Sequence, residues 1–190
     1  MSAAAAAPRL PGDGFIWYII ALEGATFSVL FLAFAFTRLG HLELFRASQQ
    51  KLDLSAGAIN TALLLTASWC VARAVQAVRA GRRGGGLGWL GLGLAGGLGF
   101  VALKLTEYAD KAAQGIGLST NLFFDFYFIL TGFHLLHVLA GLFALSLSGV
   151  GLLRQPRASL NAYTLETFAS FWHLVDLLWL VLFPLVYVMR

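Results

Sequence analysis

The chain has 190 residues, of which 59% are hydrophobic and only 12% are charged. A soluble domain usually carries about 25% charged residues, so this composition excludes an ordinary soluble domain and favours a polytopic membrane protein. The formal net charge of +4 is not arranged as a basic stripe between aromatic residues, which argues against a nucleic-acid partner. The single cysteine, Cys70, excludes an internal disulfide and a cysteine-based metal cage.

The chain begins with residues 1–14, a segment rich in small residues that Pro8 and Pro11 interrupt, and we expect it to be a lead-in to a membrane domain at 15–190. Five later segments are long and apolar enough to cross a hydrocarbon core of about 30 Å. They cover residues 15–36, 57–78, 87–108, 123–148 and 164–189. The sequence therefore predicts an all-α fold, an integral membrane bundle of five transmembrane helices.

The first predicted span contains one acid, Glu23, well inside its apolar stretch. A carboxyl group is expensive in lipid and normally faces the bundle interior, so two interpretations remain. Glu23 is either a buried carboxyl bonded to a neighbouring helix or an acid that exchanges protons. The loop that follows mixes Leu42 and Phe45 with Arg46 and Lys51, which predicts a short amphipathic helix lying on the membrane.

The loop between the second and third spans, RAVQAVRAGRRGGG at 73–86, is the most basic in the chain. Because positively charged loops remain in the cytoplasm, we expect the N-terminus inside and the C-terminus outside. The margin is narrow, seven basic residues against six. The inner set is Arg9, Arg73, Arg79, Arg82, Arg83, Arg154 and Arg157, and the outer set is Arg38, Arg46, Lys51, Lys104, Lys111 and Arg190.

The third span has a glycine-rich first half, which predicts a surface for close helix packing. Its other end carries Lys104 and Glu107, three residues apart and so on one helix face. We predict a local ion pair between them, near the outer side of the membrane.

The fourth and fifth spans carry pairs of polar residues near mid-membrane, His134 with His137 and His173 with Asp176. We expect hydrogen bonds between the two spans, because an unpaired polar group in hydrocarbon costs several kcal/mol. Together with Glu23 these residues form a predicted intramembrane polar cluster. The alternative is a metal site, and with it a stand-alone metal-dependent membrane oxidoreductase. An HxxH pair alone is a weak signal and a di-iron bundle needs two Glu-x-x-His motifs, so we assign no catalytic residue and no metal ligand.

Two segments then resemble a known family: FYFILTGFHLLHVLAGL at 126–142 and FWHLVDLLWLVLFPLVY at 171–187 are similar to helices of subunit III of haem-copper cytochrome and quinol oxidases. The resemblance continues in IALEGATFSVLF around Glu23, in NTALLLTASWCVA at 60–72 and in FVALKLTEY at 100–108. It extends over all five predicted spans.

The resemblance implies a subunit without redox centres of its own. Haem, with copper or non-haem iron, would belong to a large catalytic partner subunit in the bacterial inner membrane. The chain would support the assembly, stability and proton supply of that partner, and would bind phospholipid. Five spans instead of seven occur both in quinol-oxidase subunits III and in the NorE-type accessory protein of nitric oxide reductase. Lys104 in place of a frequent Gln and HLLHV in place of HGLHV resemble the NorE type, which implies denitrification. The alternative within the family is subunit III of a terminal oxidase.

Overall fold

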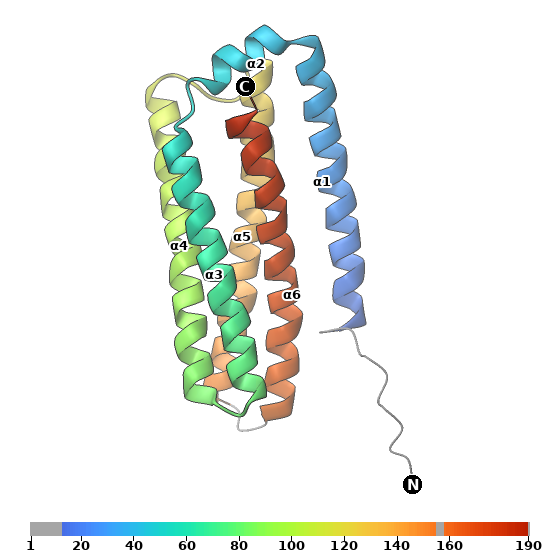
Figure 1. Ribbon diagram of the computed structural model, residues 1–190, viewed down its shortest axis with the longest axis vertical. Coiled ribbons are helices and arrows are strands. Elements are labelled where there is room, and N and C mark those ends of the chain that lie inside the picture. Colours follow the sequence, from blue (N-terminus) through green and yellow to red (C-terminus); the bar gives the residue numbers. More distant parts are fainter. Residues whose placement is uncertain (1–12, 155–157, 190) are drawn as a thin grey trace.

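The computed structural model describes residues 13–154 and 158–189, and almost all of them are helical (Figure 1). The elements are α1 (Gly14–Gly40), α2 (Leu42–Gln49), α3 (Leu54–Arg79), α4 (Arg83–Ala113), α5 (Leu122–Arg154), α6 (Ala158–Phe183) and a π-helical turn, η1 (Pro184–Val188). In Figure 1, α3 to α6 form an up-and-down four-helix bundle, α1 stands beside α6, and α2 lies across one end.

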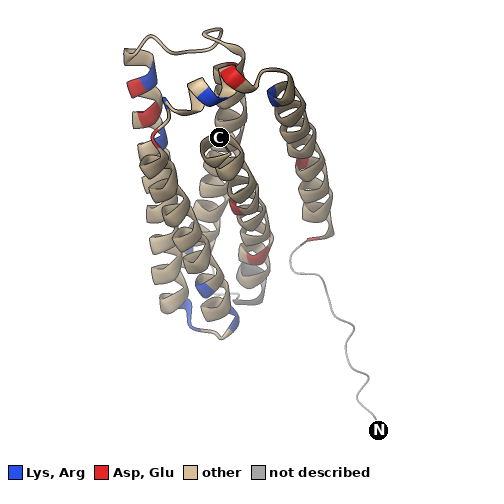
Figure 2. Cartoon of the chain, turned by 45° about the horizontal axis from the view of Figure 1, so that its top comes forward, with Lys and Arg blue, Asp and Glu red and all other residues tan. Residues whose placement is uncertain are grey.

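The described residues contain five helices with the length and hydropathy of membrane spans, as predicted. The helices run past the predicted limits; the third span was expected at 87–108, whereas α4 covers Arg83–Ala113. Helical hydrogen bonding continues beyond the hydrocarbon layer, so hydropathy underestimates helix length. Charged residues gather toward the two ends of the bundle, with few between (Figure 2). Of the predicted lead-in, residues 1–12 lie outside the described residues, and Asp13 caps α1 by accepting from the Phe15 backbone N–H.

The glycine-rich half of the third span packs closely against α3, as predicted. A Cβ atom placed on Gly93 would lie 2.9 Å from a methyl carbon of Val71, and one on Gly96 would lie 2.9 Å from Ala67. Such distances are below van der Waals contact, so only glycine at these positions allows the backbones of α3 and α4 to approach this closely.

Helix α1 contacts the bundle through Phe27 and Phe34, both fully buried, while most of its other large apolar side chains face outward. The predicted amphipathic helix is present as α2, but its apolar side faces the protein. Phe45 is fully buried and its ring centroid lies 5.2 Å from that of Phe34 and 5.4 Å from that of Phe123. Thus α2 closes the end of the bundle and connects α1 to α5.

At Pro184 the last helix changes from an α-helix to a π turn. Proline has no backbone N–H, which interrupts the α-helical ladder, and Met189 N–H instead donates to the Pro184 carbonyl over 2.9 Å. Side chains from α1 and α2 satisfy carbonyls at this end: Gln49 Nε2 donates to Val186 O at 3.0 Å, and Arg38 donates to Met189 O at 2.6 Å. The turn also directs Tyr187 into the bundle, where it is 1% exposed.

Candidate functional site

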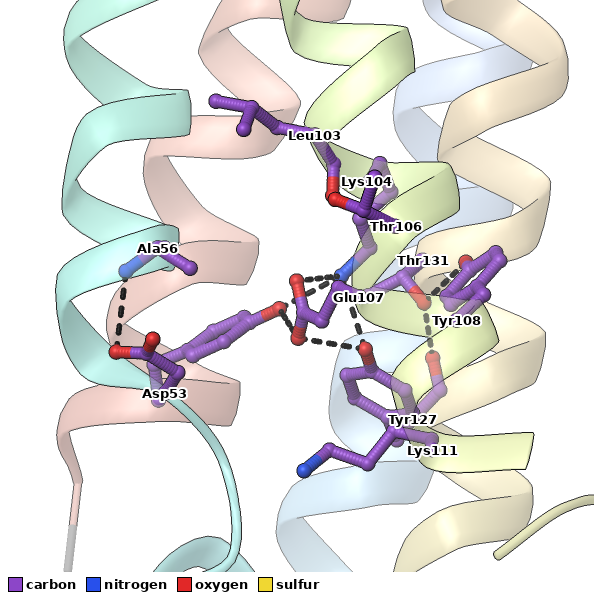
Figure 3. A network of polar contacts seen from close by, with 12 residues as sticks. Asp53, Ala56, Leu103, Lys104, Thr106, Glu107, Tyr108, Lys111, Tyr127 and Thr131 are labelled. Carbon is purple, nitrogen blue, oxygen red and sulfur yellow. Dashed lines mark hydrogen bonds and ion pairs between the residues drawn. The ribbon is translucent and has the colours of Figure 1, made fainter. Parts of the chain in front are cut away.

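The most extensive polar network among the described residues is centred on Lys104 of α4 (Figure 3). The Lys104 ammonium lies 3.1 Å from Glu107 Oε2, 3.1 Å from the Tyr127 hydroxyl and 2.6 Å from the Tyr187 hydroxyl. Both tyrosine hydroxyls also donate to Glu107 Oε1 at 2.7 Å. The pair predicted from the i, i+3 spacing is therefore the centre of a network that joins α4, α5 and η1.

Aromatic rings enclose the same ammonium. Its nitrogen lies 4.7 Å from the ring centroid of Tyr127, 5.2 Å from that of Tyr108, 5.3 Å from that of Tyr187 and 5.7 Å from that of Trp179. Lys104 is 0% exposed. A buried cation needs both a counter-ion and hydrogen-bond acceptors, and ring faces add cation–π attraction, so this pocket compensates the desolvation of the lysine.

Glu107 connects the network to a hollow of about 420 Å³ at the α2 end of the bundle. Asp53, Asp110, Lys51 and Lys111 also line this hollow, and the Lys111 ammonium donates to the Lys51 carbonyl. Glu107 is thus the member of the Lys104 network that borders this hollow.

A second polar pair joins α1 to α5. Glu23 Oε2 lies 3.1 Å from His137 Nε2, close enough for an ion pair although the angle departs from that of a good hydrogen bond. His137 Nδ1 lies 2.8 Å from the Phe133 carbonyl and must donate to it, since a carbonyl only accepts. That contact fixes the ring orientation and leaves Nε2 as the ring nitrogen that faces Glu23.

A third polar group joins α3 to α6. His173 Nδ1 lies 2.7 Å from the Ser68 hydroxyl and 3.4 Å from Asp176 Oδ2. Arg79 and Glu166 form an ion pair between the same two helices, closer to the α3–α4 turn. Trp179 Nε1 donates to Thr61 Oγ1 at 2.9 Å. Together these contacts tie α3 to α6 along their length.

The expected hydrogen bonds between the fourth and fifth spans are absent from the described residues. Helices α5 and α6 do pack side by side, but His137 faces α1 and His173 faces α3. His134 is fully buried, with neither ring nitrogen hydrogen-bonded to a described residue, and packs against the Phe100 and Trp179 rings. The expectation was wrong because residues three apart on a helix differ by about 60° in direction, enough to face different neighbours.

The predicted intramembrane cluster therefore divides into separate groups. No three His, Cys, Asp or Glu side chains within residues 13–154 and 158–189 come together in an arrangement that could hold a metal ion. The alternative of a stand-alone metal enzyme has no ligand set in this part of the chain.

Sequence reasoning missed the tyrosines of the Lys104 network and the partner of His173. Tyr127 and Tyr187 lie 60 residues apart in the sequence, and Ser68 lies 105 residues before His173. A charged residue inside an apolar run was the only available signal, because it requires compensation from some other helix.

Comparison with known proteins shows which family shares this architecture. Residues 14–190 match the family described as "Cytochrome c oxidase subunit III". The cytochrome c oxidase subunit 3 of Synechocystis sp. is 33% identical over 184 residues, which cover 96% of this chain and 77% of that protein.

Two further relatives are similar to this chain over about nine tenths of its length. The quinol oxidase subunit 3 of Bacillus subtilis is 29% identical over 175 residues, covering 91% of this chain and 84% of that protein. A heme-copper oxidase subunit I+III of Aeropyrum pernix is 28% identical over 183 residues, covering 90% of this chain and 22% of that much longer protein. With five apolar helices and these relatives, the chain is a multi-pass membrane protein. It belongs to the cytochrome c oxidase subunit III family.

Proposed function

We propose that this chain is a non-redox accessory subunit of a respiratory haem-copper complex in a bacterial inner membrane, where it supports the assembly and stability of the catalytic subunit. The observation that carries the proposal is that most intramembrane polar residues of this chain form contacts between its own helices. Apart from His134, the polar residues predicted for the site are engaged in pairs or networks that hold helices together. Lys104 of α4 donates to Tyr127 of α5, and His173 of α6 contacts Ser68 of α3. The haem, with copper or non-haem iron, belongs to the large subunit.

The name of the Aeropyrum pernix relative supports the same partner. In that protein a subunit III region shares one polypeptide with subunit I, so the two regions belong to one membrane assembly. For this chain we propose the corresponding association with a separate large catalytic subunit.

We further propose that Glu23 contributes to proton supply. Its side chain is 21% exposed at the α1–α5 contact, and its Oε2 lies 3.1 Å from His137 Nε2. A carboxyl at such a position can release and recover a proton without breaking the helix contact, because the histidine accepts it.

We also propose that the chain binds phospholipid. An apolar hollow of about 540 Å³ between α1 and α5, lined by Leu30, Phe128 and Leu136, suits a phospholipid acyl chain.

We propose a cytoplasmic N-terminus and a periplasmic C-terminus. Lys104 is buried inside the bundle, so it leaves the outer set of basic residues and the charge bias for this orientation widens.

Two kinds of catalytic partner remain. The names of the relatives favour a terminal oxidase. Lys104, where the oxidase pattern often has Gln, favours the NorE-type relative of nitric oxide reductase, because here the lysine is built into the bundle by three oxygen partners.

Purification of the tagged chain from its native membrane in mild detergent tests the proposal. We expect a large subunit to co-purify, with haem absorbance bands that the isolated chain lacks. Reduction of oxygen by the complex would identify a terminal oxidase, and reduction of nitric oxide would identify the NorE-type partner. A chain that purifies without any haem protein, from cells that express a haem-copper enzyme, would refute the accessory role.

A further inference from the structure

His173 is the most solvent-accessible of the titratable side chains predicted for the middle of the membrane. Its side chain is 39% exposed, compared with 21% for Glu23 and 12% for His137. It lies near the centre of the last span, Ala162–Val188. Its Nδ1 is engaged by Ser68 and Asp176, whereas Nε2 has no partner among the described residues.

Lipid cannot satisfy this nitrogen. Hydrocarbon chains offer no donor or acceptor, and an unsatisfied polar group in the bilayer core costs several kcal/mol. Intramembrane ionisable residues are therefore found against protein or water and not against lipid. The exposed edge of His173 indicates a polar neighbour that is absent from this chain.

The surroundings of His173 have the shape of a helix-docking surface. A groove of about 250 Å³ runs between α3 and α6, with His173 near one end and the Arg79–Glu166 ion pair near the other. Small side chains, Ala72 and Ser170, form part of its walls. Small residues allow the backbone of another membrane helix to approach closely, and drug-sized ligand pockets are larger, at roughly 300–1,000 Å³.

We propose that the α3–α6 groove receives a transmembrane helix of the catalytic subunit, which places a polar group against His173 Nε2 at mid-membrane depth. This inference rests on the proposed function, which supplies the partner. The Aeropyrum pernix relative, in which subunits I and III form one chain, is the reason for choosing the large subunit over a second copy of this chain. At the end of the groove, the half-exposed Arg79 guanidinium uses its Nε for Glu166, and its remaining donors suit a carboxylate or carbonyl at the edge of the partner helix.

Photo-crosslinking in the intact complex tests this assignment. A benzophenone amino acid replaces Leu177, which is 60% exposed one helical turn from His173. The matched control replaces Leu98 of α4, which is 59% exposed and lies at the middle of its helix. We expect illumination to link position 177, and not position 98, to the large subunit.

The other outcomes of the crosslinking experiment distinguish a wrong groove, a wrong partner and a wrong proposed function. If the large subunit co-purifies but links only through position 98, the groove assignment is overturned while the accessory function stands. A product containing two copies of this chain through position 177 would overturn the choice of partner. If no large subunit co-purifies with the unmodified chain, the proposed function itself fails.

A groove-filling variant gives a second measurement. Ala72→Leu extends a side chain into the groove without removing any internal hydrogen bond, and Ala95→Leu adds the same atoms on an exposed position of α4. We expect the first variant to reduce the recovered large subunit at least tenfold and the second to leave it unchanged, with both chains equally stable alone. Equal recovery with both variants would overturn the groove as the docking surface.

Discussion

Lys104→Met removes a buried ammonium that is hydrogen-bonded to Glu107, Tyr127 and Tyr187. The methionine fills much of the same volume, so the main effect is electrostatic. Glu107, only 6% exposed, loses its cation and keeps two tyrosine donors. Removal of one member of a buried ion pair costs about 3–5 kcal/mol, because the remaining charge stays desolvated. We expect a loss of stability of that order.

Cys70 provides the assay. It is the only cysteine in the chain and is 5% exposed in α3, so a thiol-reactive dye labels it when the bundle opens. When reclosing is fast compared with labelling, the rate follows the population of the open state. Since about 1.4 kcal/mol corresponds to a tenfold change in that population, Lys104→Met should accelerate labelling by roughly a hundredfold or more.

Two matched variants isolate the cause. Lys51→Met removes an exposed lysine side chain and should leave the labelling rate within about twofold, since surface charges contribute little. Lys104→Met combined with Glu107→Leu removes both charges, and should recover most of the stability because buried pairs can often be replaced by apolar residues. If Lys104→Met labels as slowly as the unmodified chain, or if the double variant is worse than the single one, the reasoning about charge compensation is refuted.

Three further predictions concern other helix contacts. Glu23→Gln should leave assembly intact, because the amide can donate to His137 Nε2, and should selectively change turnover or turnover-dependent inactivation. Loss of assembly would contradict the proposed role of Glu23 in proton supply. Gly97→Ala should destabilise the bundle by about 1–3 kcal/mol in the same labelling assay, because the new Cβ would lie within 2.8 Å of two neighbouring side chains. The control is Gly91→Ala, whose Cβ would meet no atom within 4 Å, and this variant should be neutral or stabilising. Asp176→Asn should weaken the α3–α6 contact by about 1 kcal/mol, because Asp176 Oδ2 lies against the His173 ring nitrogen that contacts Ser68 of α3. The yield of complex should fall while turnover per haem stays normal in what assembles, and complete inactivity in a fully assembled complex would show a catalytic role instead.

The sequence by itself determined the class of protein and the number of spans. Hydropathy depends on composition over about 20 residues, and the bilayer sets the length, so both can be read along one dimension. Local spacing also gave the Lys104–Glu107 pair, since residues three apart on a helix are neighbours whatever the tertiary structure. The helical motifs of spans four and five led to the family that the comparisons established.

Only the tertiary structure decided which helix each polar residue meets. His137 and His173 were expected between α5 and α6, and instead contact α1 and α3. A histidine in an apolar helix shows that some partner is needed, but its direction depends on helix rotation and order in the bundle. Those are determined by packing, including glycine contacts such as that of Gly93 with Val71. The same long-range packing brings Tyr127 and Tyr187 to one lysine, because interactions between distant segments exist only once every helix has its place.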